Sequence, residues 1–258
     1  MFARDFDPSA PLVYDVGHHE GGDTSYYLHR GRRVVAIEAS PLLVQSAVTT
    51  KFPVPLATKQ LVLLNVGIGP SNDVTLPFYL NKHETAFSSF VKEIACRVPG
   101  DCDHCPAKER VRMHACEEVQ VPMVTCSSLI QKYGRPSFMK IDIEGHDHFC
   151  YSSLKSLPHN LLPLQLSMES YDIDTYDFFR GLGYTKFKHA DQTQTRYHNP
   201  FPSTGSRYSN DYQFSGGLPD EIVDAASGTT KWVNYFEAKQ AYSKSHDCDL
   251  VVGGLEQL

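Results

Sequence analysis

Short apolar runs alternate with helix-forming segments over the first 64 residues, and this alternation constrains the fold most. The apolar runs cover residues 12–16, 34–37 and 61–64, and we expect helices over 24–29 and 41–51, the second opened by Pro41. An order of strand, helix, strand, helix, strand predicts a parallel sheet with right-handed crossovers. The chain is therefore predicted to be an α/β protein.

The same rhythm returns in the second half of the chain. Helices are predicted over 127–133, 149–157, 174–182 and 232–243, and strands over 138–143, 162–168 and 184–189. Residues 70–122 interrupt it with an edge strand at 74–79 and a cysteine-rich stretch, and we interpret them as an insertion or flap. Residues 191–231 are predicted to be a long loop that covers an acceptor as a lid. At 258 residues the chain, 1–258, fits a single domain that contains both segments.

Charge and hydropathy exclude several classes of protein. The net charge of −6 and the pI near 6.0 argue against nucleic acid as the partner. No run approaches the ~20 apolar residues that a membrane helix needs. The first residues lack the apolar centre of a signal peptide, so a cytoplasmic location is expected. The sequence does not indicate an oligomeric state.

Four of the seven cysteines are close in sequence: Cys96, Cys102, Cys105 and Cys116. They contain one Cys-x-x-Cys pair, a spacing that suits a tetrahedral zinc site, although a strong signal would be two such pairs. Disulfides and free thiols are the alternatives, and the spacing leaves all three open. Either cross-link would staple the flap.

The segment 136–148 combines a predicted buried strand with a dense group of polar side chains. The strand leads into Asp142, Glu144 and His146. In open α/β sheets, ligands bind outside the carboxyl ends of the strands, which makes these three residues candidates for chemistry. The alternative is that the carboxylates are solvated or structural, with Glu144 paired to Lys140.

Two features near the N-terminus predict a nucleoside ligand. The motif Asp15-x-Gly17-x-x-x-Gly21-x-x-Thr24 lies between the first strand and its helix, where glycines let a ligand approach the backbone. Its spacing is not the dinucleotide fingerprint. Glu38 ends the second strand, where an acid can accept hydrogen bonds from ribose hydroxyls.

With these motifs the chain resembles the FkbM-type family of S-adenosylmethionine-dependent methyltransferases. The resemblance covers about residues 12–170, and His18, His19 and the cysteine insertion depart from it. It implies a class I methyltransferase fold, which is Rossmann-like, with a mostly parallel sheet and helices on both faces. The positions that match the family's motifs are Asp15, Gly17, Gly21, Thr24, Glu38, Pro41, Lys140, Ile141, Asp142, Glu144, Gly145 and Asp147.

The resemblance also implies roles for particular residues, with S-adenosylmethionine as the cofactor. Glu38 would hold the ribose, and Asn65 would flank the adenine. Asp142 and Glu144 would face the sulfonium and the acceptor. The full set of residues expected to contact the cofactor is Asp15, Gly17, Gly21, Thr24, Glu38, Asn65 and Asp142.

Methyl transfer to a hydroxyl needs alignment of the acceptor and a base to take its proton. Candidates for the base are His18, His19, Asp142, Glu144 and His146, of which Asp142 and His146 are favoured. A divalent metal at Asp142 and Glu144 is an alternative, since hard cations prefer carboxylate oxygens, but we expect none.

The predicted function is O-methylation of a hydroxyl on a sugar, glycolipid or secondary metabolite. The acceptor class follows from the resemblance alone. One alternative is another nucleotide-binding Rossmann-like enzyme, such as a dehydrogenase. A second is a non-catalytic binding module that keeps the methyltransferase fold.

Overall fold

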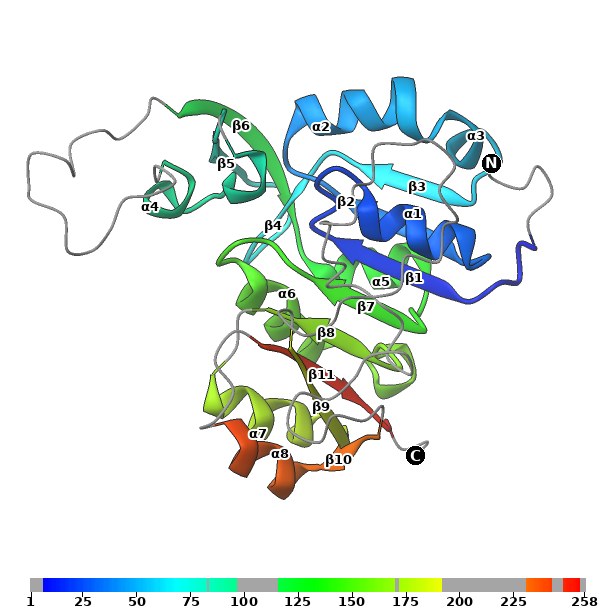
Figure 1. The fold of residues 1–258 in the computed structure, drawn as a ribbon, viewed down its shortest axis with the longest axis vertical. Coiled ribbons are helices and arrows are strands. Elements are labelled where there is room, and N and C mark those ends of the chain that lie inside the picture. The colour runs from blue at the N-terminus through cyan, green and yellow to red at the C-terminus, as the bar shows by residue number, and fades with distance from the viewer. Residues whose placement is uncertain are drawn as a thin grey trace, which may run out of the picture.

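A computed structural model describes residues 7–82, 84–96, 116–169, 172–191, 231–242 and 248–255 of the chain. An eight-stranded sheet runs through this part in the order β10-β9-β11-β8-β7-β1-β2-β3 (Figure 1). The strands from β8 to β3 pair in parallel, whereas β11 and β10 pair antiparallel to their neighbours. The strands are β1 (Leu12–Val16), β2 (Arg33–Ile37), β3 (Leu61–Leu64), β7 (Phe138–Ile141), β8 (Leu166–Met168), β9 (Lys186–Asp191), β10 (Val233–Asn234) and β11 (Cys248–Gly253).

Helices cover both faces of this sheet. Side chains of successive strand residues point to opposite faces, so each inner strand contributes apolar side chains to a core on either side. On β1, Tyr14 packs into a core that includes Ile130 and Phe179, whereas Val13 packs with Tyr27 on the other face. The predicted fold class is therefore confirmed. The helices are α1 (Gly22–His29), α2 (Pro41–Ser46), a π-helix (Ala47–Lys51), α3 (Pro53–Ala57), α4 (Lys92–Ala95), α5 (Cys126–Tyr133), α6 (Asp147–Ser153), α7 (Ile173–Gly181) and α8 (Tyr235–Ala241).

A second, three-stranded sheet lies beside the carboxyl edge of the main one, on the left of Figure 1. Its order is β4-β6-β5, formed by β4 (Gly67–Ile68), β6 (Glu117–Val124) and β5 (Thr75–Leu80). The edge strand expected at 74–79 corresponds to β5. The sequence did not predict β6, whose Pro122 is uncommon within a strand. The division of the chain into one domain with an insertion at 70–122 stays a prediction.

Several element boundaries differ from those expected. The strand β7 ends at Ile141, two residues early. The strand β8 begins at Leu166, four residues late, after a 3₁₀ turn at His159–Leu161 and an irregular stretch that contains Pro163. The strand β11 was not predicted, although its Leu250–Val252 run is buried between β8 and β9. The lid expected at 191–231 lies, apart from its two end residues, outside the described residues.

Two disulfides cross-link the described chain. Cys96 at the end of α4 is bonded to Cys116, and Cys126 of α5 is bonded to Cys150 of α6. For Cys96 and Cys116 the disulfide alternative therefore holds over a four-cysteine zinc site, while Cys102 and Cys105 lie outside the described residues. Disulfides are typical of oxidising compartments. The cytoplasmic location stays a prediction and now has this observation against it.

In the part of the chain that the structure describes, no helix is long and apolar enough to cross a bilayer.

Candidate functional site

The carboxyl ends of β1, β2 and β7 meet at one edge of the sheet, because these strands are parallel neighbours. Gly17 follows β1 and has a φ of +100°, and a Cβ there would lie 1.7 Å from the carbonyl oxygen of Asp142. The Asp142 amide in turn donates to the carbonyl of Val16 at 2.9 Å. Only glycine fits at position 17, so the loop after β1 passes directly against the end of β7.

The buried polar side chains of Asp15, His18 and Thr24 contact one another and hold this loop in place. Thr24 Oγ1 donates to Asp15 Oδ2 at 2.5 Å and lies 2.9 Å from His18 Nδ1. Burial, with a smaller contribution from the charge of Asp23, raises the pKa of Asp15 to about 7. Burial lowers the pKa of His18 to about 3, so its enclosed imidazole is neutral. These groups fix the loop, and with so low a pKa the His18 imidazole is a weak base.

Glu38 clamps the loop to the residues that follow β2. Its Oε2 accepts from the amide of His19 and its Oε1 from the amide of Ser40, both at 2.7 Å. Burial raises the pKa of Glu38 to about 7. The side-chain amide of Asn65 donates to the backbone carbonyls of Glu38 at 2.9 Å and of Ala39 at 3.0 Å. The backbone amides that bind Glu38, that of Ala39 among them, do not occupy all of the roughly four lone-pair sites of its carboxylate, so Glu38 can also accept from a ligand hydroxyl.

Lys140 joins two carboxylates inside the site. Its buried ammonium lies 2.6 Å from Asp23 Oδ2, at the start of α1, and 2.8 Å from Asp142 Oδ2. Burial would lower the pKa of Lys140, but Asp142 and Asp23 raise it well above its ordinary value. Burial would likewise raise the pKa of Asp142, and Lys140 lowers it instead. The suggestion that Lys140 pairs with Glu144 is therefore wrong.

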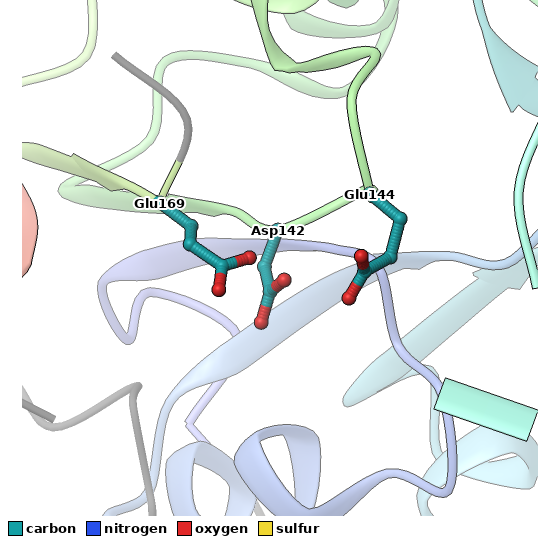
Figure 2. Close-up of side chains that lie close together, drawn as sticks. All are labelled: Asp142, Glu144 and Glu169. Atoms are coloured by element: carbon teal, nitrogen blue, oxygen red, sulfur yellow. The ribbon is translucent and has the colours of Figure 1, made fainter. Parts of the chain in front are cut away.

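Three carboxylates project from the ends of β7 and β8 in a row, as Figure 2 shows. One oxygen of each of Asp142, Glu144 and Glu169 lies within 4.8 Å of the others. Burial, with smaller contributions from Asp142 and Asp147, raises the pKa of Glu144 to about 7. Oxygens this close can share a proton or bind a hard cation. The expectation that the site needs no metal stays a prediction.

A pocket opens at this edge and contains some of the predicted site residues. Gly17, Glu38, Asp142 and Glu144 line it, together with apolar groups after β2 and β3. Its other wall is a segment between β5 and β6. The further lining residues are His18, His19, Gly22, Asp23, Ile37, Ala39, Leu43, Val66, Gly67, Ile68, Phe78, Thr85, Ala86, Ser88, Phe90, Lys140 and Ile143.

The remaining predicted residues are not among those that line the pocket. Asp15, Thr24 and Asn65 support loops through the hydrogen bonds given above, and Gly21 permits the turn before α1 with a φ of +81°. His146 is the favoured base that the pocket does not include. Its Nδ1 lies 3.2 Å from the Ile68 carbonyl oxygen and its ring stacks on Phe90, with centroids 5.0 Å apart.

Sequence reasoning missed three parts of the site. Asp23 gives no signal beyond being an acid in a first helical turn. Glu169 directly follows β8, so the argument that selected Asp142 after β7 could have found it. The wall segment with Thr85 and Phe90 falls in the predicted flap, where no pattern distinguishes pocket residues.

Comparison with known proteins places the chain in a class. Residues 15–192 match the family model described as a methyltransferase FkbM domain. That match covers more than half of the chain, so the chain belongs to the FkbM methyltransferase family and has the fold of a methyltransferase. The resemblance inferred from the sequence is confirmed.

Two solved structures are similar at low identity. One is the methyltransferase FkbM from Methylobacillus flagellatus KT, with 15% identity, a TM-score of 0.38 and coverage of 67% of this chain and 36% of that chain. The other is precorrin-6y C5,15-methyltransferase from Geobacter metallireducens GS-15, with 10% identity, a TM-score of 0.34 and coverage of 97% and 84%. The chain thus spans about a third of the first structure. Among curated proteins, none matches this sequence.

The Lys140 ion pairs predict a large and non-additive effect on stability. Lys140→Met should lower the free energy of unfolding by about 3–5 kcal/mol, since it leaves two buried carboxylates without their cation. Asp23→Asn should cost less alone, and the double variant less than the sum of the two. Urea unfolding measures all three, with exposed Lys132→Met as a control expected within about 0.5 kcal/mol. Additive losses would contradict the pairing.

Burial of Glu38 predicts a pH-dependent difference between wild type and Glu38→Gln. The folded pKa of about 7 lies above the unfolded value of 4.5, so protonation of Glu38 favours the folded state. The wild type should therefore lose stability relative to the variant as pH rises from 5 to 8, by up to about 3 kcal/mol. Thermal and urea unfolding across that range measure it, and parallel pH curves would show that Glu38 is not buried as described.

Proposed function

We propose that this protein transfers a methyl group from S-adenosylmethionine to a hydroxyl of a small-molecule or glycan acceptor. The observation that carries the proposal is the pocket in which Gly17, Glu38 and Glu144 meet at the carboxyl edge of three parallel strands. Membership of the FkbM methyltransferase family supports it. The sugar, glycolipid or secondary-metabolite acceptor rests on the family alone.

The pocket offers different chemistry at its two ends, which suits the cofactor. Glu38 has acceptor lone pairs for ribose hydroxyls, and the apolar side chains of Leu43, Val66 and Ile68 suit an adenine ring. Asp142 carries a negative charge held by Lys140, a favourable neighbour for a sulfonium cation. When bound, the cofactor would supply the methyl group.

Glu144 is the best-placed group to accept the acceptor's proton. Its carboxylate lines the pocket, and no ion pair to it occurs among the described residues. Its pKa of about 7 lies near working pH, which favours general base catalysis. Asp142 is less suitable, because Lys140 lowers its pKa. His146 is less suitable because it lies outside the pocket lining.

S-adenosylhomocysteine should bind this pocket and raise the melting temperature, because a ligand selective for the folded state stabilises it. Isothermal titration calorimetry measures the affinity. Glu38→Ala should weaken binding strongly, whereas Glu118→Ala, an exposed acid on β6, should leave it unchanged. Binding of a nicotinamide nucleotide in place of S-adenosylhomocysteine would favour a dehydrogenase. Binding without turnover on any acceptor would favour a binding module.

Glu144→Gln should lower kcat by about a hundredfold or more, the usual scale for loss of a general base, while affinity for S-adenosylhomocysteine changes little. Wild-type kcat should rise with pH through about 7, since Glu144 accepts a proton only when ionised. Single-turnover rates across pH 5–9 measure both. A pH profile unchanged in Glu144→Gln would assign the base elsewhere.

A further inference from the structure

One wall of the pocket is a short segment, residues 84–96, that we call the strap. It contains a 3₁₀ turn at Thr85–Phe87 and the helix α4, and its last residue is bonded to Cys116. Asn81, which precedes the strap, contacts both of its ends. Asn81 Oδ1 accepts from the Glu84 amide at 2.9 Å, and its side-chain amide donates to the Ala95 carbonyl at 2.9 Å. These two bonds tie the first and the last turn of the strap to Asn81, next to the end of β5.

The strap contacts two loops that line the pocket. Thr85 Oγ1 lies 2.9 Å from Nε2 of His19, in the loop after β1. Ser89 Oγ donates to the Glu144 carbonyl at 2.8 Å, in the loop after β7. Thr85 and Phe90 also line the pocket between these contacts. A molecule in the pocket is thus enclosed by the strap on one side.

The two contacts differ in how firmly they hold. At the Ser89 contact, which we call the far end of the strap, Ser89 is buried and Phe90 stacks on His146. The Thr85 contact is the near end. At the near end, the contact between His19 and Thr85 is exposed, and the adjoining Phe87 is 41% exposed. Opening at the near end breaks exposed contacts, each worth only about 1 kcal/mol, whereas opening at the far end would uncover buried groups, so the near end releases first.

The near end also lies over the predicted ribose position. His19 donates its backbone amide to Glu38 Oε2 at 2.7 Å, while its imidazole reaches the strap. The same residue therefore connects the ribose acid with the movable end of the wall. Opening this end would expose the pocket beside Glu38.

We propose that the His19–Thr85 hydrogen bond is a latch that closes the strap over the cofactor pocket and sets the rate of cofactor exchange. His19 and Thr85 are then positioning residues and take no part in methyl transfer. The inference rests on the proposed function, since it assigns the pocket to S-adenosylmethionine and its product.

The test measures association and dissociation rates of S-adenosylhomocysteine by stopped flow. Thr85→Val removes the hydroxyl at nearly constant shape, and Thr85→Ser keeps it as the matched control. His19→Asn suits the backbone, because asparagine tolerates the φ of +49° at this position, but its side chain is shorter than that of histidine. The backbone amide that binds Glu38 is present in every variant.

Strap opening precedes both entry and exit, so a released latch should raise both rates together. We expect Thr85→Val and His19→Asn each to raise both about two- to tenfold, with little change in Kd. The double variant should raise both rates by less than the product of the two single effects, since both changes break the same bond. Thr85→Ser should behave as wild type.

Unchanged rates in Thr85→Val would overturn the latch, as would a faster dissociation alone with a matching loss of affinity, which indicates damage to the pocket. If His19→Asn does not fold, the comparison of Thr85→Val with Thr85→Ser decides by itself. Absence of binding to the wild type is a separate result that contradicts the proposed function and the latch with it.

Discussion

The buried ammonium of Lys140 is the interaction on which the geometry of the site depends. It joins Asp23 at the start of α1 to Asp142 after β7, residues 119 positions apart in the sequence. Without this cation, the carboxylates of Asp15, Asp23 and Asp142 would repel one another at one sheet edge. A buried ion pair is weak evidence for stability by itself, but it fixes which elements meet and in what register.

The same ion pairs separate the chemical roles of neighbouring acids. Asp142 contacts a cation and loses its proton readily, whereas Glu144, two residues on, has no ion pair within the described part of the chain and has a pKa raised to about 7. Environments that push the pKa values of adjacent carboxyl groups apart suit one for charge stabilisation and the other for proton transfer. Glu38 has a third environment, in which backbone amides bind both of its oxygens.

Much of the fold could be predicted from local patterns. The apolar runs of β1, β2, β3 and β7 and the glycines after β1 are local signals, and parallel order follows from the helices between them. The end of the apolar run of β2 also placed Glu38 directly after that strand. The contacts between Lys140 and Asp23, and between His19 and Thr85, could not be predicted, because they join distant segments whose meeting depends on the folded topology. The Cys126–Cys150 disulfide was missed for the same reason.

The most direct test of the proposed site is a crystal structure of the protein with S-adenosylhomocysteine. We expect the ribose hydroxyls to be hydrogen-bonded to Glu38, the sulfur to face Asp142 and Glu144, and Lys140 to remain paired with Asp142. A nucleoside bound elsewhere, or a sulfur directed away from both carboxylates, would contradict it.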